Sequence, residues 1–169
     1  MIQIKNAAEL QKMRKACAIS AAALKAGGEA IEPGITTAEI DKIIYDFIVR
    51  HGARPNFLHL YGFPATACIS VNDTVIHGIP NKQQQIRPGD IVSIDTGCKI
   101  DGFNGDNACT YACGKIDLEA QRLLDVTKES LHRGIEMACG GNRVGDIGHA
   151  VQSYVCLLYT SPSPRDGLL

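Results

Sequence analysis

The chain has 169 residues, of which 45% are hydrophobic, so it is long enough to form one core of ordinary density. Its net charge is −1 with charges spread evenly, which gives no sign of nucleic acid or a membrane surface as partner. No apolar run approaches the ~20 residues of a membrane span, and the N-terminus lacks a secretory pattern. We therefore expect a cytoplasmic protein in which most of the seven cysteines are small buried hydrophobes.

The first third of the chain predicts two helices. The capping-box pattern at residues 6–9 opens a helix to about Lys25, where Gly27-Gly28 weaken it. A second box at residues 36–39 opens a helix with apolar residues at helical spacing, which Gly52 stops.

Further along, short strands are predicted at residues 69–71 and 75–77, and a long amphipathic helix over residues 118–138. Another helix is expected to begin at residue 144 or 146, after the Gly140-Gly141 break. The glycine break and helix at residues 33–48 are echoed at residues 140–155, which indicates a duplicated α+β architecture.

A hairpin in the middle of the chain carries the most informative pair of residues. Asp101-Gly102 lies between alternating apolar segments, and a two-residue type I′ turn requires positive φ at both positions. With these residues as the loop, Gly97 faces Asp106, and Asp95 points to the same side because side chains alternate along a strand. The two carboxylates are then diagonal neighbours with backbones roughly 7–8 Å apart, beside a position that has no side chain. Two like charges beside a hole favour a cation, so we predict a metal site at Asp95 and Asp106.

Other interpretations of these acids remain open on the residues alone. Both could be solvated residues that flank a turn, or Asp95 could be held in a structural ion pair. Residues 95–97 also match the D-T-G motif of aspartic proteases, but those enzymes need two such aspartates and this chain has one copy.

Four stretches of the chain carry specific motifs, at residues 62–80, 87–95, 101–106 and in the helix that begins at Asp146. The segment V-N-D-T-V-I-H-G-I-P, which lies in the first stretch, is the most specific. Together the four stretches resemble type I methionine aminopeptidases of the pita-bread fold, and the resemblance runs over residues 1–155. It implies an α+β fold, the N-terminal half of a duplicated pita-bread architecture, in which helices flank an antiparallel sheet.

The resemblance implies a metal-dependent hydrolase that removes the N-terminal methionine of nascent proteins when the next residue is small. Two divalent ions, of Co, Mn, Fe or Zn, would activate water, with Asp106 bridging them and Asp95 holding one. His77 would contact the substrate near the scissile bond, although on the residues alone it could equally be structural. Phe57 and Phe63 would line an apolar methionine pocket. The partners would be nascent N-termini near the ribosome, with no nucleic acid and no membrane.

In this family a histidine and two glutamates from the second half complete the site, and none of them lies in this sequence. We therefore expect residues 1–155 to be the N-terminal part of a catalytic domain, truncated at its C-terminal side. Residues 156–169 place two prolines where a helix should continue, and they resemble a translated sequencing adaptor, so we expect a non-native tail. The chain itself should be inactive, with Ile94 uncovered on the inner face of the hairpin.

Three rival functions remain. A pita-bread peptidase specific for proline-containing peptides is disfavoured by H-G-I-P at residues 77–80. A non-catalytic binding protein with this fold is disfavoured because both aspartates are present. An inert fragment of the enzyme is compatible with the main interpretation.

Overall fold

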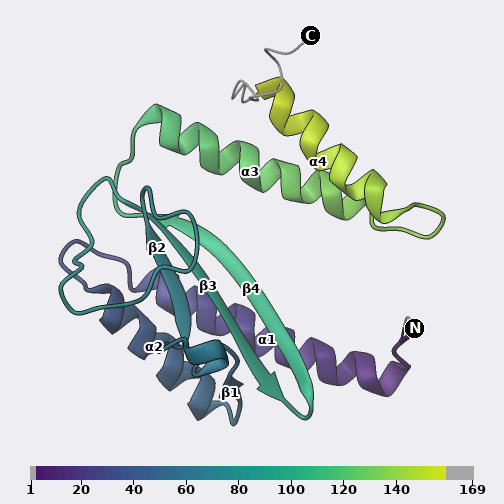
Figure 1. The fold of residues 1–169 in the computed structure, drawn as a ribbon, viewed down its shortest axis with the longest axis horizontal. Coiled ribbons are helices and arrows are strands. Elements are labelled where there is room, and N and C mark those ends of the chain that lie inside the picture. The colour runs from purple at the N-terminus through teal and green to yellow at the C-terminus, as the bar shows by residue number, and fades with distance from the viewer. Residues whose placement is uncertain (1–2, 159–169) are drawn as a thin grey trace. The chain divides into compact units, whose positions relative to one another are not determined.

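The computed structural model describes residues 3–158, which fall into two compact units (Figure 1). The units are Met1–Ile116 and Asp117–Leu169, and each is described by itself. The first contains α1 (Ala7–Glu29), α2 (Thr37–Arg50), β1 (Arg54–Pro55), the short 3-10 helix η1 (Leu60–Gly62), β2 (Ala67–Val71), β3 (Ile91–Ile100) and β4 (Phe103–Ala112). The second contains α3 (Leu118–Glu136) and α4 (Val144–Leu158). Within residues 3–158, every helix is too short or too polar to cross a membrane.

Helix α1 begins as the sequence predicts, but it does not end at the predicted glycines. Asn6 accepts a hydrogen bond from the backbone N–H of Glu9, and the Glu9 carboxylate accepts from the backbone N–H of Asn6. The helix then continues through Gly27 and Gly28. A Cβ at Gly28 would lie 2.2 Å from the Tyr111 ring, so this position needs a glycine for close packing rather than for a helix end.

Helix α2 agrees with its prediction at both ends. The capping box between Thr36 and Glu39 is present, and Gly52 adopts a φ of 71° just beyond the helix. Ile40, Ile44 and Ile48 are fully buried against the sheet and α1.

Strand β3 is the centre of the four-stranded antiparallel sheet. On one side it pairs with β4 over its whole length, and on the other side it pairs with β1 and β2. The predicted hairpin register is confirmed, because Ile100 pairs with Phe103 and Gly97 with Asp106. The turn residues Asp101 and Gly102 have φ values of 53° and 86°, as a type I′ turn requires.

The sheet has one covered and one open face. Helix α1 crosses behind β3 and β4 in Figure 1, and the even-numbered side chains of β3 lie in the core on that face. Ile94 is 0% exposed, so the expectation that it would be uncovered is wrong. The expectation placed Ile94 on the same face as Asp95. The two residues are neighbours in a strand, so their side chains point to opposite faces.

The prediction of a strand at residues 75–77 is also wrong, because these residues form an exposed loop. Val75 is 92% exposed, and His77 has a φ of 60°. The loop returns to β2, where the Ile69 N–H donates to the Gly78 carbonyl at 2.9 Å. Three residues are too few for alternation to distinguish a strand from a loop.

The second unit is a pair of helices joined across the predicted glycine break. A Cβ at Gly134 of α3 would lie 2.9 Å from Val151 of α4, and the Arg133 guanidinium lies 3.9 Å from the centre of the Tyr154 ring. Helix α4 begins at Val144, as expected, and includes residues 156–158 of the predicted tail. The rest of that tail, residues 159–169, lies outside the described residues, and the predicted domain limits remain a prediction.

Cysteine burial differs from the expectation for most of these side chains. Three of the seven are buried, all of them in the first unit, and the other four are exposed. The buried three are Cys68, Cys98 and Cys113.

Candidate metal centre

Asp95 of β3 and Asp106 of β4 lie on the open face of the sheet. Asp106 is the register partner of Gly97, two residues after Asp95, so the two carboxylates are diagonal neighbours as predicted. Asp95 is half-buried and Asp106 is exposed.

The charges of this pair work against each other. Burial raises the pKa of Asp95, and the nearby Asp106 carboxylate raises it further. Only His77 acts in the opposite direction on the pKa of Asp95, because a positive imidazolium would stabilise the carboxylate. A carboxylate such as Asp95, whose charge is disfavoured by burial and by a second carboxylate, is stabilised by a cation.

Cys68 of β2 is a neighbour that the sequence did not single out. It is the register partner of Asp95 and is buried. Burial, followed by the charges of Asp95, Asp106 and Asp41, raises the pKa of the Cys68 thiol to about 11. At neutral pH this thiol is therefore protonated, and it contributes an apolar side chain rather than a thiolate ligand.

The predicted hole beside Asp106 is partly filled. A Cβ at Gly97 would lie 3.0 Å from the amide nitrogen of the Asn56 side chain and 3.0 Å from the Gly105 carbonyl. The Asn56 N–H also donates to the Gly97 carbonyl at 2.9 Å. Asn56 thus fixes the start of the following loop against the hairpin, a role with no local signal because its partner lies far along the chain.

His77 lies close enough to the carboxylates for its charge to affect Asp95. Within residues 3–158, however, no three His, Cys, Asp or Glu side chains form a group that could hold a metal ion. His77 is placed by the structure as a neighbour of Asp95. Its position depends on the loop that Gly78 anchors, since the Gly78 N–H donates to the Ser70 hydroxyl at 3.1 Å.

Phe57 and Phe63 are the two ends of a tight loop, and both are half-buried. The His59 N–H donates to the Phe63 carbonyl at 2.8 Å, and the Leu60 N–H donates to the Phe57 carbonyl at 2.9 Å. These bonds hold the two aromatic residues near each other at the base of the loop, while Tyr61 at its tip is fully exposed.

Asp41 of α2 holds the beginning of β2. Its Oδ1 atom accepts hydrogen bonds from the backbone N–H groups of Thr66 at 2.9 Å and Ala67 at 2.8 Å. Burial raises the pKa of Asp41, while these two bonds act to lower it. The residue determines where β2 starts and therefore where Cys68 meets Asp95.

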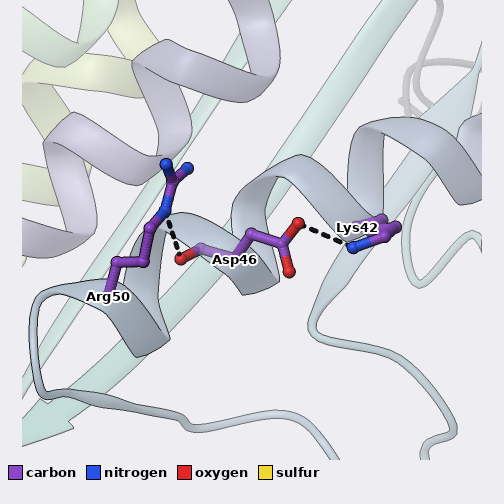
Figure 2. Close-up of polar contacts among 3 residues, drawn as sticks. All are labelled: Lys42, Asp46 and Arg50. Atoms are coloured by element: carbon purple, nitrogen blue, oxygen red, sulfur yellow. Dashed lines mark hydrogen bonds and ion pairs between the residues drawn. The ribbon is translucent and has the colours of Figure 1, made fainter.

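A surface depression on α2 is not part of this centre. Its volume is about 300 Å³, and Asp46, Val49 and Arg50 line it. Figure 2 shows that Lys42 and Arg50 both bind Asp46, through an ion pair of 2.7 Å and a bond of 3.0 Å to its carbonyl. Both contacts join residues one helical turn apart within α2. The polar groups of the depression are therefore already bound to one another.

The donor chemistry of the centre fits part of a divalent-metal site. Two carboxylates on one face suit the hard and borderline cations Mn, Fe, Co and Zn. They supply two ligand side chains, which is fewer than a stable site of any of these ions uses. Asp95 and Asp106 therefore have the chemistry of two ligands in a divalent-metal site, with the remaining ligands still to be supplied.

The chain is similar to known proteins over most of its length. Residues 11–159 match the model of metallopeptidase family M24. Methionine aminopeptidase of Clostridium acetobutylicum is 46% identical over 155 residues, and methionine aminopeptidase 1 of Bacillus subtilis is 43% identical over 155 residues. Each match covers 92% of this chain, which spans 62% of either relative's length.

Solved structures agree with the predicted fold. The crystal structure of methionine aminopeptidase from Rickettsia prowazekii matches with a TM-score of 0.89 and 37% identity, over 92% of this chain and 62% of that one. Prolidase from Pyrococcus furiosus has a TM-score of 0.77 at 21% identity, covering 90% of this chain and 43% of that one, so it shares the fold alone. The antiparallel sheet with its flanking helices is thus the pita-bread architecture that the sequence predicted. The chain belongs to metallopeptidase family M24.

Proposed function

We propose that this protein is a methionine aminopeptidase, which removes the N-terminal methionine of new proteins whose second residue is small. The observation that carries the proposal is the pair Asp95 and Asp106, which are diagonal neighbours on the open face of the sheet in a chain 46% identical to a methionine aminopeptidase. A peptidase for proline-containing peptides is less well supported, because prolidase and the similar solved enzymes are 24% identical or less.

Asp95 and Asp106 would be two of the side chains that hold divalent metal ions. When bound, such ions polarise a peptide carbonyl and make water a nucleophile at neutral pH. The protein's part is to present both carboxylates from a rigid hairpin, in which β3 is paired on both sides. Two carboxylates do not select among Co, Mn, Fe and Zn, so which ion binds would depend mainly on which metal is available.

The residues around the pair are proposed to bind the substrate. His77 would form a hydrogen bond next to the scissile peptide, a role that its position beside Asp95 supports. Phe57 and Phe63 would contact the methionine side chain, since thioether sulfur packs favourably on aromatic rings. The substrates would be nascent N-termini, in the cytoplasm close to the ribosome.

A chimera tests the proposal directly. Residues 1–155 would be fused to the part of the Clostridium acetobutylicum enzyme that lies beyond its match to this chain. We expect the chimera to release methionine from a Met-Gly peptide with added Mn²⁺, and Asp106→Asn to reduce turnover to background. Asp101→Asn, in the same hairpin, should leave turnover nearly unchanged because Asp101 binds Lys15 at the exposed turn.

The 169-residue chain without an added segment is the second arm. It should bind Mn²⁺ weakly and release no methionine, because two carboxylates leave most coordination positions to water. An inactive chimera with correct metal content, or an Asp106→Asn chimera as active as its parent, would refute the proposal.

A further inference from the structure

Two cysteines of the first unit meet where α1 crosses the hairpin. Cys17 of α1 is exposed, Cys98 of β3 is 0% exposed, and both are free thiols. The Cys98 Sγ atom donates a hydrogen bond to the Ala16 carbonyl at 3.5 Å. It therefore contacts the peptide group that joins Ala16 to Cys17, and the Cys17 side chain begins one bond beyond that group.

The backbones are also very close at this crossing. Gly105 of β4 is the register partner of Cys98, and a Cβ at Gly105 would lie 2.6 Å from the Cys17 backbone nitrogen. Only a glycine allows the helix to come this near. Disulfides join residues whose Cα atoms are roughly 4.4–6.8 Å apart, and contacts of this kind put Cys17 and Cys98 within reach of that spacing.

The side chains of the two cysteines are near each other as well. Burial raises the pKa of the Cys98 thiol, and a negative charge on Cys17 raises it further. Such an effect weakens with distance, so the Cys17 sulfur lies in the neighbourhood of Cys98. The two thiols differ in access, because a dissolved molecule can reach the exposed Cys17 but not the buried Cys98.

We propose that Cys17 and Cys98 are a redox pair, which forms a disulfide between α1 and β3 when the protein meets a small disulfide such as oxidised glutathione. The exposed Cys17 attacks one glutathione sulfur, the bond between Cys17 and glutathione forms, and the other glutathione leaves as a thiol. The Cys98 sulfur then attacks the Cys17 sulfur and releases the second glutathione. Two protein thiols are oxidised, one glutathione disulfide is reduced, and the two protons pass to the glutathione thiols. The reaction needs neither a metal ion nor aminopeptidase activity.

Mass spectrometry of the 169-residue chain tests the pairing. The reduced protein is diluted so that chains rarely meet, incubated with oxidised glutathione, alkylated with iodoacetamide and digested with trypsin. We expect a pair of peptides linked through Cys17 and Cys98, lighter by two hydrogen atoms than the separate peptides. A chain in which Cys17 carries only glutathione, or in which its bridge joins a second chain, would overturn the inference.

Cys109→Ser is the matched control, because Cys109 is an exposed cysteine of the same hairpin whose thiol donates to the Thr110 carbonyl at 3.7 Å. It should leave the yield of the Cys17–Cys98 bridge unchanged. Cys98→Ala should stop the reaction after its first step, with glutathione retained on Cys17. If Cys17 in that variant bridges another cysteine in the yield of the parent, Cys98 is not its specific partner and the inference is refuted.

Thermal melting gives a second readout. The bridge would close a loop of about 80 residues, so the oxidised parent should melt about 10 °C above the reduced parent. Cys17→Ser changes an exposed side chain, so it should fold as the parent does and melt at one temperature with or without oxidised glutathione. A bridged parent that melts no higher than the reduced parent would show that native packing opposes the bridge, which also contradicts the pairing.

Discussion

Asp41→Ala should destabilise the first unit strongly, although Asp41 lies in a helix and is only half-buried. Its Oδ1 atom is the acceptor for the N–H groups of both Thr66 and Ala67. These two residues are 1% and 0% exposed, so the carboxylate shields their N–H groups from water. Each buried N–H that loses its partner costs about 1–3 kcal/mol.

The expected loss in the free energy of unfolding is about 3 kcal/mol, toward the lower end of the sum for two N–H groups. At roughly 4 °C per kcal/mol for a unit of this size, the melting temperature should fall by about 12 °C. Hydrogen exchange gives the local readout, because the Thr66 and Ala67 amides should lose protection before the rest of β2.

Asp46→Ala is the matched control, with the same substitution in the same helix. The Asp46 side chain is 42% exposed and binds Lys42 at 2.7 Å (Figure 2), an interaction worth about 0.2–1 kcal/mol. Both variants gain similar helix propensity from alanine, so the comparison isolates the hydrogen bonds. Equal losses of stability in the two variants would refute the assigned role of Asp41.

Three further outcomes are expected. Gly105→Ala should cost about 3 kcal/mol, because its Cβ would lie 2.3 Å from the Ala16 carbonyl oxygen; a urea melt like that of wild type would contradict this packing. The pKa of Asp41 is raised in the folded protein, so wild type loses stability as the pH rises above 3.8. The melting temperature of Asp41→Asn minus that of wild type should therefore increase from about pH 3 to pH 7. A difference that stays constant over this range would exclude the raised pKa. His77→Ala in the chimera should lower turnover about 100-fold with metal content unchanged, and a parallel loss of metal would make His77 a ligand.

The features that the sequence predicted correctly have their cause within a few residues. The capping boxes at Asn6 and Thr36 and the turn at Asp101-Gly102 each need only their own segment. The turn then fixes the register, and the register fixes the placement of both carboxylates. For this reason the best-predicted part of the candidate site is also its most local part.

The errors and omissions arise from contacts between distant segments. Gly28 stays inside α1 because Tyr111, far along the chain, packs against it. Asp41 and Asn56 bind backbone groups that follow them by many residues, and nothing in the composition of their own segments marks them. The loop before Gly78 looked like a strand because the sequence does not reveal that it turns back onto β2.

Because side chains alternate along β3, a single register with β4 decides both which side chains are buried and which face the open side of the sheet. A slip of one residue against β4 would turn Asp95 toward α1 and expose Ile94 to water, exchanging the environments of the two side chains. The misaligned hairpin would lose its core and bury a charge at the same time. A chain that has reached its stable form has therefore also placed Asp95 where an ion can reach it. The alignment that buries Ile94 is therefore the same alignment that the proposed metal site requires.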